Sequence, residues 1–354
     1  MAGAPRQMSS PRQVNSPLLE NIRAQPKALR QVADYQLGPG REALLRSAEL
    51  IRSSNRVILS GMGASAFACV PVAYALGTEV IDSSELLYFR QSILKQETTV
   101  VLVSRSGESV EVIKLLPILR QTGCRVIGVT NVPGSTLATQ ANEAIILNSP
   151  ADQLVAIQTY TATVLALLLL ADPSPADLYT TIETFERQLN AGFMAGDAES
   201  EFLSPNAPVY LLGRGPALGS VLEGALLFHE MAKLPAIGMQ AAQFRHGPVE
   251  VVDAGFRAII FGTTPETLPL DAGLAGDLLQ MGAKICWIGP SSAAPAGAIV
   301  FDVAPQRFAP LLEIVPCQLL AYRLTEARGV TPGAFRWAPA ITRSETGFMS
   351  AKSQ

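Results

Sequence analysis

The feature that most constrains the fold is a strand, a glycine turn and a long helix that occur twice, far apart in the chain. Residues 56–76, RVILSGMGASAFACVPVAYAL, run from an apolar strand through Gly-x-Gly into a helix, and residues 208–231, PVYLLGRGPALGSVLEGALLFHEM, repeat that order. Further apolar strands alternate with helical patterns, which is typical of an α/β fold with a parallel sheet. The sequence therefore predicts two doubly wound subdomains related by duplication, each a flavodoxin-like three-layer sandwich.

A proline-bearing linker separates the two halves. The stretch ADPSPAD, residues 171–177, follows a long apolar helix predicted over 154–170, and a polar helix is predicted from Leu178 to about residue 195. We expect a disordered segment at 1–15, a first subdomain at 16–195, a second at 196–346 and a tail at 347–354.

Composition excludes several classes of function. The 354 residues are 48% hydrophobic and 16% charged, which is typical of a well-buried globular protein. A formal net charge of −3 shows no basic excess, so we expect no nucleic-acid partner. The longest aliphatic stretch, residues 164–171, is well short of the roughly 20 residues of a membrane span. The N-terminal residues lack the apolar core of a signal peptide. We expect a soluble, cytoplasmic protein with no membrane partner.

Cysteine and histidine usage argues against a metal site. The four cysteines are widely scattered without a CxxC pair, and the only histidines are His229 and His246, so the ligand spacing of a zinc site is missing. We expect buried, reduced thiols, no metal and no other cofactor. The cysteines are Cys69, Cys124, Cys286 and Cys317.

The segment SRSGES, residues 104–109, lies where an apolar strand passes into a helix. Unpaired N–H groups and the helix dipole attract anions at a helix N-terminus. Hydroxyl groups add donors there, and glycine lets the backbone approach a ligand closely. A capping serine is the structural alternative, but it accounts for one hydroxyl, whereas Ser104, Ser106 and Ser109 surround Gly107. The segment predicts a phosphate-binding loop.

A dinucleotide-binding fingerprint is the competing interpretation of the first half. The stretch GMGASA, residues 61–66, fits Gly-x-Gly-x-x-Ala after a strand, and Glu79 or Asp82 follows about 20 residues later. The hydroxyl-rich segment has no role in that fingerprint, and the second Gly-x-Gly, at 213–215, indicates a feature of the fold instead. An NAD-dependent enzyme stays an alternative hypothesis.

With SGMGAS and SRSGES in the first half and LEGALLFHEMAKLPAIGMQAAQFRHGPVEVV in the second, the chain resembles the sugar isomerase (SIS) domain family. The likeness is to tandem members: the isomerase half of glucosamine-6-phosphate synthase and the free-standing phosphosugar isomerases and deaminases. It extends over roughly Ser16 to Thr346, nearly the whole chain. The resemblance implies two SIS subdomains, a sugar-phosphate ligand and a homodimer.

The resemblance also implies roles for matching residues. Glu230 matches the catalytic glutamate, and His246 in RHGP matches the ring-opening histidine, which relatives commonly bring across a dimer interface. Glu223 falls on the same helical face as Glu230 and is expected to support it. A solvated helix edge with Lys233 as ion-pair partner is the structural alternative for Glu230. The residues implied to bind sugar or phosphate are Gly63, Ala64, Ser65, Ser104, Arg105, Ser106, Gly107, Ser109, Val155 and Arg343.

Two departures from the family pattern affect substrate and mechanism. VAIQT, at 155–159, replaces a Val-Ala-Ser-Thr-Lys run, so the wall of the site differs. Leu227 stands where the synthases carry a lysine three residues before the catalytic glutamate, and Arg343 stands where they carry a lysine in the tail. Leucine neither forms an imine nor transfers a proton. The glutamine-hydrolysing domain, with its cysteine directly after Met1, is not found in this sequence, so we do not expect a complete glutamine-dependent synthase.

These observations predict a phosphosugar isomerase or aminosugar-phosphate deaminase that works through an enediol or enediolamine. Moving a proton between adjacent carbons requires a general base, and a carboxylate in a dry crevice has the raised pKa that suits this task. The alternative class is a non-catalytic phosphosugar sensor, and the NAD-dependent enzyme is a third hypothesis.

Overall fold

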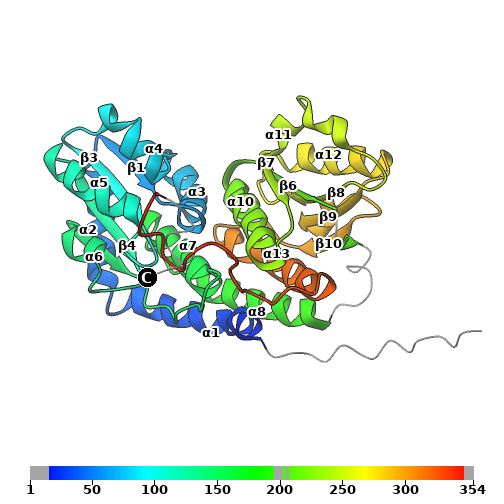
Figure 1. Cartoon of the computed structure of the whole chain (residues 1–354), viewed down its shortest axis with the longest axis horizontal. Coiled ribbons are helices and arrows are strands. Elements are labelled where there is room, and N and C mark those ends of the chain that lie inside the picture. Colours follow the sequence, from blue (N-terminus) through cyan, green and yellow to red (C-terminus); the bar gives the residue numbers. More distant parts are fainter. Residues whose placement is uncertain (1–15, 195–201, 205–206, 347–354) are drawn as a thin grey trace, which may run out of the picture.

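Two five-stranded parallel sheets, one in each half of the chain, form the framework of the protein (Figure 1). The computed structural model describes residues 16–194, 202–204 and 207–346. The predicted disordered segment 1–15, the predicted tail 347–354 and the predicted boundary between residues 195 and 196 lie outside the described residues.

The two sheets have the same topology. In the first sheet the strand order is β2-β1-β3-β4-β5, and in the second it is β10-β9-β8-β6-β7, which is the same winding read from the other edge. This repeated order confirms the predicted duplication of a doubly wound, flavodoxin-like unit. The strands are β1 (Arg56–Ser60), β2 (Glu79–Val80), β3 (Thr98–Val103), β4 (Arg125–Thr130), β5 (Glu143–Ile146), β6 (Val209–Gly213), β7 (Ala236–Gln240), β8 (Arg257–Phe261), β9 (Lys284–Gly289) and β10 (Ile299–Asp302).

Helices cover both faces of each sheet. Those of the first half are α1 (Pro17–Leu37), α2 (Arg41–Arg52), α3 (Ala64–Leu76), α4 (Ser83–Tyr88), α5 (Val110–Gln121), α6 (Thr136–Gln140) and α7 (Gln158–Ala171), with η1 (Gln91–Ile93). Those after the linker are α8 (Leu178–Met194), α10 (Leu218–Leu227), α11 (Ala241–Phe244), α12 (Leu268–Gln280) and α13 (Ala309–Ala327), with η2 (Gly215–Ala217), η3 (Phe228–Ala232), η4 (Pro248–Val251) and η5 (Ser291–Ala293).

The start of the long apolar helix differs from the prediction. α7 begins at Gln158, not at residue 154, because the Asp152 carboxylate accepts hydrogen bonds from the backbone N–H groups of Ile157, Gln158 and Thr159. A carboxylate in this position satisfies donors that the first helical turn leaves unpaired. The segment before Gln158 is therefore free to run as a loop.

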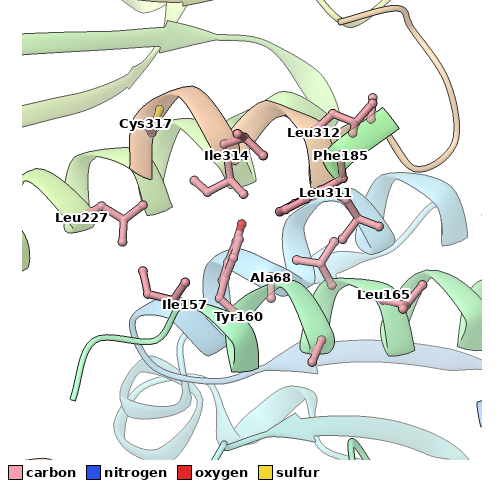
Figure 2. Close-up of a cluster of buried hydrophobic side chains, with 14 of the residues drawn as sticks. Ala68, Ile157, Tyr160, Leu165, Phe185, Leu227, Leu311, Leu312, Ile314 and Cys317 are labelled. Atoms are coloured by element: carbon pink, nitrogen blue, oxygen red, sulfur yellow. The ribbon is translucent and has the colours of Figure 1, made fainter. Parts of the chain in front are cut away.

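One apolar core joins the two halves. Its largest cluster includes Ala68 of α3, Tyr160 of α7, Leu227 of α10 and Ile314 of α13 (Figure 2). α7 is apolar on all sides, which is the pattern of a fully enclosed helix. The shared core fixes the position of α10 in the second half relative to the loops of the first. No helix in the described part of the chain is both long and apolar enough to cross a membrane.

Candidate active site

The site begins where strand order reverses in the first sheet. β1 and β3 are neighbours whose connections leave in opposite directions, and in such sheets ligands bind outside the carboxyl ends of these strands. The turn after β1 touches the end of β3, since a Cβ atom at Gly61 would lie 3.0 Å from the carbonyl oxygen of Val103. Gly63 is exposed with φ +50°, and Ala64 and Ser65 begin α3 half-buried.

The hydroxyl loop, residues 104–109, connects β3 to α5. The hydroxyl oxygens of Ser104 and Ser106 accept hydrogen bonds from the N–H groups of Gly107 and Glu108, both at 3.1 Å. Ser104 and Ser109 hydroxyls lie 3.1 Å apart, and Ser109, the N-cap of α5, makes no side-chain cap. One of the hydroxyls of Ser104 and Ser109 donates to the other, so the second of this pair and Ser106 keep protons to donate to an anion at the helix N-terminus.

Glycine is required at position 107 of the hydroxyl loop. Gly107 has φ +68°, and a Cβ atom built there would lie 2.1 Å from the hydroxyl oxygen of Ser135. Glu108, the next residue of the loop, is held in place because its carboxylate accepts a 2.6 Å hydrogen bond from the N–H of Thr136. The loop is thus held tightly against the N-terminus of α6.

Arg105 and the C-terminal segment close one side of the loop. The Arg105 guanidinium donates to the carbonyl oxygens of Leu154 at 3.1 Å and Ala340 at 3.2 Å. The N–H of Val110 donates to the carbonyl oxygen of Thr342 at 3.1 Å. Figure 1 shows this red segment crossing from α13 to the first half. It brings Arg343, which is exposed and directly follows Thr342, to the start of α5.

Glu230 approaches the loop from the second half. It lies in η3, a π-helical turn that continues α10, and single π turns in helices are frequent at functional sites. Burial raises the pKa of Glu230 to about 7, against the lowering effect of the positive charges of Lys233 and Arg105. Because Arg105 belongs to the hydroxyl loop, a charge from the first half acts on a carboxylate of the second half.

Glu223 is a second carboxyl group near Glu230. Its side chain is 1% exposed, and its Oε2 has no hydrogen-bond partner among the described residues. Burial, followed by the negative charges of Glu230 and Asp152, raises the pKa of Glu223 well above its usual range. Burial thus acts in the same direction on both carboxyl groups and favours the protonated form of Glu223.

Two other predicted site residues, His246 and Val155, have contrasting surroundings. His246 is exposed in the turn between α11 and η4, after the edge strand β7, and no hydrogen bond or ion pair among the described residues joins it to Glu230. Its neighbour Arg245 pairs with Asp277 at 3.5 Å. The Val155 side chain is 2% exposed and belongs to the core, so a contact with a ligand there would fall to its main chain.

Sequence reasoning missed the part that Asp152 plays. Asp152 both caps α7 and acts on the pKa of Glu223. An acidic residue shortly before an apolar helix was the available signal. In the described residues no group of three or more histidine, cysteine, aspartate or glutamate side chains is placed to hold a metal ion.

Comparison with protein families matches the SIS domain to residues 50–172 and again to residues 202–325. The chain belongs to the SIS-domain family. Its tandem arrangement agrees with the two sheets described above. This bears out the resemblance drawn from the sequence motifs.

Curated relatives include two enzymes described as glutamine–fructose-6-phosphate aminotransferase (isomerizing). The one from Pyrococcus horikoshii is 27% identical over 335 residues, covering 89% of this chain and 55% of the relative. The one from Pyrobaculum aerophilum is 30% identical over 339 residues with the same coverage. The SIS-domain chain thus spans about half the length of these relatives.

Solved structures share the fold at low identity. The C-terminal domain of glucosamine-fructose-6-phosphate aminotransferase from Francisella tularensis has TM-score 0.79 and 19% identity, covering 91% of this chain and 98% of that one. Tagatose-6-phosphate ketose/aldose isomerase from Escherichia coli has TM-score 0.76 and 24% identity, covering 92% and 97%. Glucosamine-6-phosphate deaminase from Thermotoga maritima has TM-score 0.76 and 20% identity, covering 92% and 99%.

Proposed function

We propose that this SIS-domain protein is an enzyme acting on a phosphorylated sugar, as an aldose–ketose isomerase or as an aminosugar-phosphate deaminase. The observation that carries the proposal is the pair of carboxyl groups, Glu223 in α10 and Glu230 in the π-helical turn η3, whose pKa values are both raised by burial. The solved relatives named as an isomerase and a deaminase support both forms of the proposal.

The hydroxyl loop binds the phosphate in this proposal. Ser106 and one of the pair Ser104 and Ser109 supply hydroxyl protons, and the N-terminus of α5 supplies a positive dipole end. The rigidity that Gly107 gives the loop keeps these donors in place before the ligand arrives. The phosphate then anchors the sugar so that its reactive carbons lie toward the carboxyl groups.

Glu230 moves the proton. Its carboxylate takes the proton from the carbon next to the carbonyl, and the C–H electron pair forms the C=C bond of an enediolate. Glu230 then returns the proton to the former carbonyl carbon, while the proton of the neighbouring hydroxyl moves to the former carbonyl oxygen and leaves the new carbonyl. In deamination the corresponding enediolamine becomes an imine, which water hydrolyses to a ketose and ammonia. A pKa of about 7 lets Glu230 serve as base and then as acid at neutral pH. Glu223, whose raised pKa favours the protonated form, donates a hydrogen bond to the oxygen that gains charge.

His246 opens the sugar ring from a second copy of the chain. Its exposure at the edge of the second sheet suits a residue that acts on the partner subunit's site. An imidazole has one nitrogen that can accept a proton and one that can donate it, which suits proton transfer to and from a ring oxygen. This part of the proposal requires a homodimer.

A panel of sugar phosphates tests the proposed activity. Hexose, aminohexose and pentose phosphates are incubated with the protein, and ketose formation and ammonia release are measured separately. Ketose without ammonia identifies an isomerase, and both products together identify a deaminase. Tight binding of a sugar phosphate with no product would contradict the proposal and favour a sensor.

A further inference from the structure

Lys233 has an unusual conformation directly after the turn that holds Glu230. It ends η3 in the left-handed region, with φ +55° and ψ +32°, and its ammonium group donates a hydrogen bond to the carbonyl oxygen of Glu230. The same ammonium lies 5.7 Å from the centre of the Phe335 ring. The Lys233 side chain is thus held between η3 and the segment that follows α13.

Neither the backbone nor the burial favours a lysine at this position. Helices that end in a left-handed residue usually place glycine there, because a side chain is strained in that conformation. Burial also lowers the pKa of Lys233, while the negative charge of Glu230 raises it. A strained residue that keeps a partly buried charge points to a role at a functional site.

The position three residues before Glu230 carries no charged side chain. Leu227, three residues before Glu230, is 1% exposed and packs in the core shared by the two halves (Figure 2). Lys233, three residues after Glu230, follows the end of η3, and its ammonium group turns back to the carbonyl oxygen of Glu230. The second half therefore places its positive charge after the carboxylate instead of before it.

We propose that Lys233 is a positioning residue that keeps Glu230 ionised and oriented for proton transfer, in place of a charge at position 227. This inference rests on the proposed function of Glu230. The other charges around Glu230 do not replace Lys233. Arg105 is engaged by two carbonyl oxygens of the first half, Glu223 is an acid, and Arg336 acts on Lys233 itself.

The test compares Lys233→Met, Lys233→Asn and Lys233→Arg with the wild-type protein. Carboxyl 13C NMR follows the titration of Glu230 in the full chain without substrate, with Glu230→Gln identifying the signal. The wild-type midpoint is expected near pH 7. Lys233→Met and Lys233→Asn should raise the midpoint of Glu230 by about one pH unit, because a positive charge near the carboxylate is lost. Lys233→Arg, which keeps the charge, should leave the midpoint at its wild-type value. Asn tolerates the left-handed conformation, so it separates loss of charge from poor folding.

Activity provides the second readout. With a turned-over sugar phosphate, the acid limb of the kcat/KM pH profile should move upward in Lys233→Met by the same amount, while Lys27→Met, at an exposed site on α1, should leave it unchanged. An unchanged Glu230 midpoint in both neutral variants would overturn the role of Lys233. Full turnover by Glu230→Gln would instead overturn the proposed function, whatever the titration shows.

Discussion

At the scale of single residues, the acidity of Glu230 is set by burial and by charges that include one from the other half of the chain. The motif around Glu230 indicated a catalytic carboxylate, and the helical spacing pointed to Glu223 as its companion. The pKa of Glu230 depends on burial and on Arg105, which comes from the other half of the chain. The unpaired Oε2 of Glu223 likewise reflects packing that no local pattern describes. Properties set by distant neighbours became visible only in the folded chain.

The raised pKa of Glu230 predicts how stability depends on pH. A rise from 4.5 to about 7 corresponds to about 3 kcal/mol. Because the folded form holds the proton more tightly, this contribution is complete below pH 4.5 and is lost as pH rises to about 7. The unfolded form gains relative stability over that window.

Urea unfolding of the wild-type protein and Glu230→Gln at pH 4.5 and pH 8 measures this loss. The variant, which cannot ionise, should lose roughly 3 kcal/mol less stability between the two pH values than the wild type. Equal losses in both proteins would show that Glu230 has an ordinary acidity in the folded state.

At the scale of elements, strands and loops followed the sequence more closely than helix ends did. The hydroxyl loop lies between a buried strand and a helix, as its residues predicted, and the polar helix α8 begins at Leu178 as expected. The start of α7 was misplaced, because Asp152 caps the helix from a loop that apolar periodicity does not detect. The π-helical turn η3 was not predicted, since no residue pattern distinguishes it from ordinary helix.

Gly107→Ala tests the rigidity of the hydroxyl loop. The positive φ and the close Ser135 hydroxyl should destabilise the variant by roughly 1–3 kcal/mol and weaken binding of inorganic phosphate. Thermal unfolding and phosphate titration measure the two effects. Gly134→Ala is the matched control, because a Cβ there meets nothing within 4 Å. If both variants behave alike, the loop does not depend on glycine at position 107.

At the scale of the whole molecule, the duplication was evident in the sequence and the joining of the halves was not. Two Gly-x-Gly turns followed by helices predicted the repeated sheet, and both sheets have the same strand order. The shared core, by contrast, depends on how α3, α7, α10 and α13 pack together, and this packing holds the two halves in a fixed arrangement. In the proposed homodimer, a second chain also contributes a residue, His246, to the site.

Mixed dimers test whether His246 acts across an interface. Glu230→Gln and His246→Ala proteins are each expected to be inactive. After subunit exchange, half of the dimers would hold one intact site, so activity should recover to about a quarter of the wild-type value. A mixture that stays inactive after confirmed exchange would place His246 outside the partner's site.

Solvent exchange tests the central claim, that Glu230 moves a proton between neighbouring carbons of a sugar phosphate. The measurement is proton NMR in D2O with the substrate that the panel identifies. Wild-type protein and Glu49→Gln, an exposed glutamate paired with Arg52 at 2.6 Å, should bring deuterium into the carbon next to the carbonyl. Glu230→Gln should still bind the sugar phosphate and slow this exchange by about 100-fold or more. Exchange at the wild-type rate in Glu230→Gln would contradict the account.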